Sequence, residues 1–258
     1  MTHGLFDGIP EWLVFLATIA AFLLAAWGGY RLGARVRARG VSSEIAELGT
    51  TVGGLLGMLG LLLAFTFGMA GERFDRRKTL VVEEANAIGT AYLRTDLIPE
   101  PHRTQARDAL RDYTQSRLDA VDPSRRAEAI ARSERIQVTL WSTTSAAAAA
   151  APTATVALFV SAVNEVIDMH ARRVYAALRN PIPPAIFATL YAVAVLVLGA
   201  LGYARGLTGD RSKAATAVLT LVLSVVILLI LDLDRPYEGL LTVSQQAMQD
   251  VRAMMGPK

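Results

Sequence analysis

The chain of 258 residues has no cysteine, which excludes disulfides, thiolate nucleophiles and cysteine-based metal sites. It also lacks an Asn-x-Ser/Thr acceptor, a Gly-x-Ser-x-Gly motif, a phosphate-binding loop and a dinucleotide fingerprint. Its three histidines, His3, His102 and His170, share no motif with a nucleophile, and no segment alternates like a strand. These absences predict an all-α protein that is not an enzyme and holds no cofactor or metal.

Apolar residues make up 53% of the chain and gather in uncharged runs. About 20 apolar residues in a helix cross the roughly 30 Å hydrocarbon layer of a bilayer. We therefore expect an integral membrane protein in the lipid bilayer, with four transmembrane helices at residues 12–30, 48–71, 184–204 and 214–231. The net charge is only +3, with Lys and Arg interleaved with Asp and Glu, so no nucleic-acid partner is expected.

A helical extramembrane domain is expected at residues 72–183, between the second and third spans, and a C-terminal tail at residues 232–258. No turn signal follows the second span before Pro99 and Pro101, which predicts one long helix that leaves the membrane. Further helices are expected at 102–120, 125–151 and 153–179. The uncharged segment 137–164 leaves a fifth span open, although Pro152 at its centre favours a buried helix of the domain.

Small residues recur in the second span at intervals of three and four, which places them on one stripe of a helix. They are Gly49, Gly53, Gly57, Gly60, Ala64 and Gly68. Such a stripe lets another backbone approach closely, and this predicts tight packing against another span. A pore-lining face between subunits is the alternative, and an oligomer allows both.

Four basic residues follow this stripe: Arg73, Arg76, Arg77 and Lys78. They serve either as topological anchors or, in a ring of subunits, as a pore mouth that concentrates anions. Glu83, Glu84 and Asn86 come next on the same helix, where the basic residues one or two turns earlier are their expected partners.

Two carboxylates, Asp232 and Asp234, close the fourth span. Carboxylates at a membrane boundary are costly unless they are solvated or paired, and Arg235 is a candidate partner. Two carboxylates without another hard ligand do not favour a metal site.

Several segments together resemble the bacterial bestrophin-like family, formerly a domain-of-unknown-function family. They are Phe65-Thr-Phe-Gly, Val82-Glu-Glu-Ala-Asn86, Tyr92-Leu-Arg-Thr-Asp-Leu-Ile-Pro99 and Leu233-Asp-Arg-Pro-Tyr-Glu-Gly239. The resemblance covers nearly the whole chain and implies a four-span helical protein. It also marks Glu83, Glu84, Asn86, Asp234 and Arg235 as the polar residues of the family motifs.

A more remote similarity links the chain to the bestrophins proper, which are pentameric anion channels with a pore lined by the second span. This similarity implies a homo-oligomer, a pentamer by analogy, that passes inorganic anions such as chloride. Leu61, Phe65 and Met69 would then form the apolar neck of the pore. The acidic cluster of the bestrophin calcium clasp has no counterpart here. A membrane-anchored scaffold or interaction protein is the alternative function.

The basic residues give opposing indications of the orientation in the bacterial inner membrane. No Lys or Arg precedes the first span, and Arg31, Arg35, Arg37 and Arg39 follow it in an expected short hairpin, which favours an external N-terminus. Basic residues at both membrane-proximal ends of the domain argue for the opposite. The resemblance also implies a cytoplasmic domain, and that is the orientation we expect.

Overall fold

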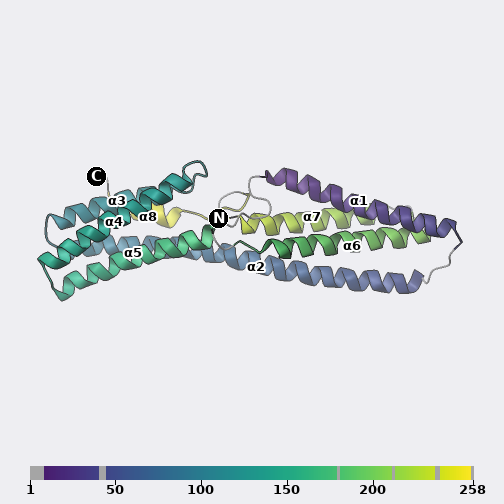
Figure 1. The fold of residues 1–258 in the computed structure, drawn as a ribbon, viewed down its shortest axis with the longest axis horizontal. Helices are drawn as coiled ribbons and strands as arrows, with labels where there is room; N and C mark the ends of the chain where they lie inside the picture. Colours follow the sequence, from purple (N-terminus) through teal and green to yellow (C-terminus); the bar gives the residue numbers. More distant parts are fainter. Residues whose placement is uncertain (1–8, 41–44, 179–180, 211–212, 236–238, 257–258) are drawn as a thin grey trace. The chain divides into compact units, whose positions relative to one another are not determined.

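The computed structural model describes residues 9–40, 45–178, 181–210, 213–235 and 239–256. Every regular element in these ranges is helical, which confirms the all-α prediction (Figure 1). The chain divides into two compact units: Met1–Arg73 with Pro181–Arg235 form unit 1, and Phe74–Asn180 with Pro236–Lys258 form unit 2. The elements are α1 (Glu11–Ala38), α2 (Ile45–Arg94), the 3-10 helix η1 (Thr95–Leu97), α3 (His102–Asp119), α4 (Arg126–Ala150), α5 (Ala154–Leu178), α6 (Pro184–Thr208), α7 (Ala214–Asp234) and α8 (Gln246–Met254).

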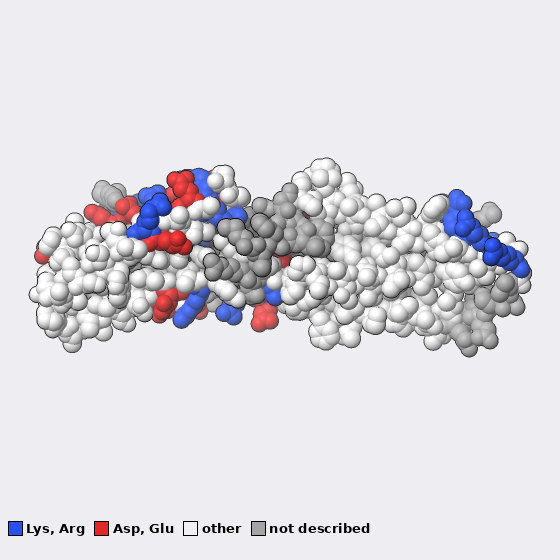
Figure 2. Space-filling model, in the orientation of Figure 1, with Lys and Arg blue, Asp and Glu red and all other residues white. Residues whose placement is uncertain are grey.

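Unit 1 contains the four apolar runs, carried by α1, the first part of α2, α6 and α7. The 25 residues of α6 give a length of about 38 Å, which is enough to cross a bilayer. Figure 2 shows an almost uncharged face over α1, α6 and α7, which suits contact with lipid. The structure therefore supports a membrane protein with several apolar spans.

Close packing of glycines joins α1 to α6. A Cβ added at Gly29 would lie 2.0 Å from the carbonyl oxygen of Gly199, and one added at Gly202 would lie 2.1 Å from that of Ala26. A Cβ added at Gly33 would lie 2.2 Å from the carbonyl oxygen of Tyr203. From Gly29 to Gly33 the residue numbers in these contacts rise together along both helices. The two helices are therefore parallel, and side chains are excluded where their backbones meet.

Helix α1 is longer than the predicted span and includes most of the residues that were predicted to form a basic hairpin. It continues from Glu11 to Ala38, so Arg31, Arg35 and Arg37 are helical residues. The expectation of a hairpin at these positions is wrong, because the Arg and Ala residues after the apolar run are good helix formers and no Pro interrupts them before Gly40.

Helix α2 confirms the predicted long helix that continues past the second apolar run. It contains 50 residues and ends at Arg94, and η1 then leads into extended backbone at Ile98. Pro99 and Pro101 follow at once and prevent the helix from resuming before α3. The part of α2 after Arg73 belongs to unit 2.

Unit 2 packs α2, α3, α4 and α5 around an apolar core with fully buried Ile88, Leu110, Leu140 and Phe159. The uncharged segment 137–164 is not one helix, because α4 ends at Ala150 and α5 begins at Ala154. Among the described residues, α5 is itself one of five helices that are long and apolar enough to cross a membrane.

A final helix, α8, lies within the residues for which only a tail was expected. Its Met248 is fully buried and the following Met255 is 2% exposed, both within the core cluster of unit 2. The sequence reasoning missed this helix because nine residues are too few for a clear apolar period.

Candidate pore helix and buried ion cluster

The predicted neck residues lie on a face of α2 that its own unit leaves exposed. Leu61 is 56% exposed and Phe65 is 65% exposed, while Met69 is partly buried. The buried face of the same helix segment carries Leu59 and Leu63. Large apolar side chains are thus available for contact with lipid or with another copy of the chain.

The small-residue stripe of α2 also faces open space. A Cβ added at Gly53, Gly57, Gly60 or Gly68 would meet no atom within 4 Å. The stripe therefore makes no close helix contact within the described part of this chain. That role falls to the glycines of α1 and α6, which the sequence reasoning did not single out.

The four basic residues after the stripe differ in exposure. Arg76 and Lys78 are exposed, Arg73 is partly buried, and Arg77 is only 7% exposed. A helix with 3.6 residues per turn necessarily spreads neighbouring residues over several faces, so these four side chains do not form one uniform surface.

Glu84 is the centre of a buried ion cluster in unit 2. Its Oε1 accepts hydrogen bonds from the Tyr113 hydroxyl at 2.7 Å and from Nε of Arg117 at 2.8 Å, and its Oε2 accepts one from Nη1 of Arg173. Three helices, α2, α3 and α5, therefore meet at one carboxylate. The expectation that Glu84 pairs with basic residues on its own helix is wrong, because its partners come from α3 and α5.

The cluster holds two cations for one carboxylate. Arg117 is 2% exposed and Arg173 is 5% exposed, so water does not screen either guanidinium effectively. Nη2 of Arg173 also donates to Oε1 of Gln245 at 2.7 Å, which ties the residue just before α8 to the cluster. A buried charge is tolerated only when it is paired and hydrogen-bonded, and this network supplies both conditions.

These surroundings shift the ionisation of the buried groups. Burial by itself raises the pKa of Glu84, but the charges of Arg117 and Arg173 and the hydrogen bonds outweigh burial and lower it to about 2. Burial first, and then the neighbouring Glu84 carboxylate, raises the pKa of Tyr113 well above its usual value. Burial and the charge of Arg117 lower the pKa of His170 to about 4.

The hydrogen bonds assign the tautomer of His170. Glu84 is ionised, so the Tyr113 hydroxyl must donate its proton to the carboxylate. Nδ1 of His170 lies 3.2 Å from that hydroxyl and must therefore carry the proton that it donates to the Tyr113 oxygen. Neutral His170 thus extends the chain of hydrogen bonds that leads to Glu84.

The other two motif residues of α2, Glu83 and Asn86, are exposed. They line an open groove of about 480 Å³ between α5 and the part of α2 that belongs to unit 2. The groove also receives Thr90 and Arg94 from α2 and Ser161, Glu165 and Arg172 from α5. Glu83 and Glu84 are adjacent in the sequence, but Glu83 is exposed in the groove whereas Glu84 is buried in the ion cluster.

The motif residues near the end of α7 lie in unit 1. The carboxylate of Asp234 accepts the backbone N–H of Ile182 at 3.1 Å and so ties the end of α7 to the chain just before α6. Arg235 reaches Glu11 at 3.6 Å and donates to the carbonyl oxygen of Ile9 at 3.1 Å. Motif residues thus join segments far apart in the sequence. Within the described residues, no group of acidic or histidine side chains could hold a metal ion.

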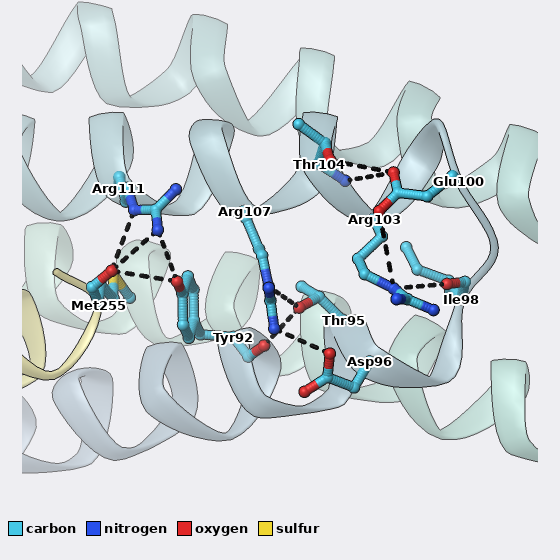
Figure 3. A network of polar contacts seen from close by, with 10 residues as sticks. All are labelled: Tyr92, Thr95, Asp96, Ile98, Glu100, Arg103, Thr104, Arg107, Arg111 and Met255. Atoms are coloured by element: carbon cyan, nitrogen blue, oxygen red, sulfur yellow. Dashed lines mark hydrogen bonds and ion pairs between the residues drawn. The ribbon is translucent and has the colours of Figure 1, made fainter. Parts of the chain in front are cut away.

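A second polar network attaches α8 to α2 and α3 (Figure 3). The carbonyl oxygen of Met255 accepts hydrogen bonds from the Tyr92 hydroxyl at 3.1 Å and from Nη2 of Arg111 at 2.9 Å. Nη2 of Arg111 also donates to the Tyr92 hydroxyl at 2.8 Å. Nearby, Arg107 bonds Thr95 at 2.9 Å and Asp96 at 2.8 Å, which fixes η1 against α3.

The comparisons with known proteins agree with this architecture. The model of the Bestrophin-like domain matches residues 20–248, nearly the whole chain. The chain belongs to the Bestrophin-like family. This membership supports an ion-channel kind of function.

Solved structures share the fold of this Bestrophin-like protein. A bacterial Bestrophin homolog from Klebsiella pneumoniae superposes with a TM-score of 0.66 at 16% identity, over 95% of this chain and 98% of the other. A crystal structure described as a membrane protein variant gives a TM-score of 0.68 at 15% identity, over 96% and 99%. At these identities the likeness establishes the fold alone. No curated protein sequence matches the chain.

Sequence reasoning missed most of the ion cluster of this Bestrophin-like protein, although its signal was present. Arg117 follows Leu110 and Tyr113 on the buried face of α3, and Arg173 follows Val166 and His170 on that of α5. A charged residue at a position of the apolar stripe indicates a buried ion, which requires a partner on another helix.

Proposed function

We propose that this protein is an oligomeric anion channel in which several copies of α2 line the pore. The exposed apolar face of α2, with Leu61 and Phe65, carries the proposal. In a ring of subunits this face forms a narrow apolar neck with Met69, and apolar constrictions control ion passage by excluding water. The open glycine stripe on the adjoining face allows close approach of the next copy.

Anion preference in this proposal comes from the basic residues that follow the neck. Arg73 and Arg76 recur once per subunit in a ring, which raises the local concentration of anions and repels cations. The permeant ion is then a small inorganic anion such as chloride. A pentamer is the subunit number that the bestrophin analogy implies.

The proposal counts four spans and places α5 in an extramembrane unit 2. Its support is that α5 carries Glu165, Asp168, Arg172 and Arg173, and that Arg173 ion-pairs with buried Glu84. Charges of this kind are costly in hydrocarbon. We place unit 2 and both termini in the cytoplasm. A reporter that is active only in the cytoplasm, fused to the C-terminus, tests this placement. The absence of a signal from it would show the opposite orientation.

Ion flux through purified protein in liposomes tests the channel. With opposed chloride and potassium gradients, we expect a reversal potential near that of chloride. Phe65→Ala should raise conductance by widening the neck, while Phe67→Ala, on a different face of α2, is the matched control. Charge reversal at Arg73 and Arg76 should weaken the anion preference. A reversal potential that follows potassium, or no flux from folded protein, overturns the proposal.

The groove of unit 2 favours a second function, a membrane-anchored scaffold. Its lining holds exposed acidic and basic side chains, among them Glu83, Glu165 and Arg172, which suit a polar protein partner. Capture of one stoichiometric partner that Glu83→Arg abolishes, together with no ion flux, would support the scaffold over the channel.

A further inference from the structure

Exposed basic residues gather at one end of unit 1, where α1 ends (Figure 2). The 28 residues of α1 extend for about 42 Å, which exceeds the roughly 30 Å hydrocarbon layer. Its last turns therefore emerge at the level of the lipid headgroups. Arg31, Arg35, Arg37 and Arg39 occupy these turns and the position after them, and all four are exposed.

The adjoining ends of α6 and α7 extend this surface. A Cβ added at Gly209, just after α6, would lie 1.8 Å from Nη1 of Arg37, so this guanidinium lies directly over the end of α6. Arg205 of α6 bonds the hydroxyl of Thr216 in the first turn of α7, and exposed Lys213 immediately precedes α7. Three helix ends thus contribute to one surface.

We name this surface the basic end and define it as Arg31, Arg35, Arg37, Arg39 and Lys213. Among the described residues at these helix ends, the one carboxylate is Asp210, and Nε of Arg205 lies 3.4 Å from it. The opposite end of unit 1 differs, because Asp232 and Asp234 lie at the end of α7 there and Arg235 ion-pairs with Glu11. The excess positive charge therefore belongs to the basic end.

An aromatic side chain marks the depth of this end in the bilayer. The Arg31 guanidinium lies 4.7 Å from the ring centroid of Trp27, which is 57% exposed. Tryptophan concentrates at the boundary between hydrocarbon and headgroups, and arginine beside it reaches outward to the phosphate groups. Trp27 and Arg31 thus place the basic end at phosphate level.

We propose that the basic end binds the headgroups of anionic phospholipids selectively. Among the described side chains of this surface the guanidiniums outnumber the one carboxylate, Asp210, and such a surface fits lipid phosphates, since Arg forms paired hydrogen bonds with phosphate oxygens. Each basic residue near an anionic leaflet strengthens association about fivefold. This inference rests on unit 1 spanning the membrane and is independent of channel activity.

Quenching of Trp27 fluorescence by brominated lipids tests the proposal. In a variant with Trp12→Phe and Trp141→Phe, brominated phosphatidylglycerol should quench Trp27 with at least a fivefold higher relative binding constant than brominated phosphatidylcholine. A variant that keeps Trp12 alone, at the opposite end of α1 beside Glu11, is the matched reporter. It should show no preference between the two lipids.

Substitution of the arginines assigns the preference to the basic end. The triple change Arg35→Gln, Arg37→Gln and Arg39→Gln should reduce the preference at Trp27 to near unity, with unchanged helix content by circular dichroism. If the triple variant loses helix content, the single Arg39→Gln, which lies beyond α1, should still lower the preference severalfold. Equal quenching by both lipids in the parent protein, or a preference that all these variants retain, overturns the proposal.

Competition with free phosphate distinguishes binding of lipid headgroups from binding of inorganic phosphate, since both present the same phosphate oxygens. Inorganic phosphate at constant ionic strength should leave the lipid preference unchanged, because a leaflet presents many phosphates at once. Loss of the preference at millimolar phosphate would instead identify a site for the free ion and overturn the lipid assignment.

Discussion

Neutralising Glu84 should destabilise unit 2 more than any conservative change at its surface. Glu84→Gln keeps the size of the side chain but leaves Arg117 and Arg173 buried together without their carboxylate. Removing one partner of a buried ion pair costs about 3–5 kcal/mol, because the remaining charge is uncompensated. The expected loss of stability is therefore a large fraction of that of an ordinary domain.

The shifted pKa of Glu84 gives a similar value for the stability that its carboxylate contributes. It falls from an ordinary value of 4.5 to about 2 on folding. At about 1.4 kcal/mol per pKa unit, this shift corresponds to about 3 kcal/mol of stability at neutral pH. Because the folded pKa is lowered, this contribution is complete above pH 4.5 and is lost as the pH falls toward 2.

Thermal unfolding of the detergent-solubilised protein, followed by hydrogen exchange of α3 and α5, measures the effect. We expect Glu84→Gln to lower the melting temperature of these helices by roughly 10 °C. Glu83→Gln is the matched control, since Glu83 adjoins Glu84 on α2 but is exposed. Equal, small shifts for both variants would refute the role assigned to the buried cluster.

Four further predictions follow from other contacts. His170→Gln should remove part of the acid destabilisation between pH 6.5 and 4, because a histidine with a lowered folded pKa loses stability as pH falls through that window; identical acid titrations of the parent and variant would contradict this. Gly202→Ala should destabilise unit 1 by about 1–3 kcal/mol in thermal unfolding, since its Cβ meets the α1 backbone. Gly60→Ala should leave the protomer folded but shift the oligomer toward smaller species in light scattering, whereas an unchanged mass would exclude the stripe from the subunit interface. Arg111→Met should increase hydrogen exchange in α8 with little change in α6, because it removes two donors to the carbonyl oxygen of Met255, the residue just after α8.

The helices of this protein and its family could be predicted in part from the sequence. Uncharged runs identified the apolar helices, since a bilayer imposes a minimum apolar length on any span. Pro99 and Pro101 marked the end of the long helix because proline lacks the backbone donor that helix continuation needs. The family motifs, such as Val82-Glu-Glu-Ala-Asn86, identified the family that the domain match then confirmed.

The contacts made by the candidate site residues were harder to predict from the sequence than the helices were. The glycine stripe of α2 was an obvious pattern, yet the close backbone contacts within the chain lie between α1 and α6 at Gly29, Gly33 and Gly202. A stripe of small residues permits close approach but does not name the partner helix. Likewise, Glu83 and Glu84 look equivalent as neighbours in a charged helix, although one is exposed and the other is fully buried.

The sequence by itself determined the helical class and the apolar helices, because these follow from composition and local periodicity, and its motifs identified the family by resemblance. Only the tertiary structure decided that Glu84 meets Arg117 and Arg173, residues 33 and 89 positions away along the chain. It likewise decided that α8 closes unit 2 through Met255. Pairings of this kind depend on how helices from distant parts of the chain pack together, and no local pattern specifies that packing.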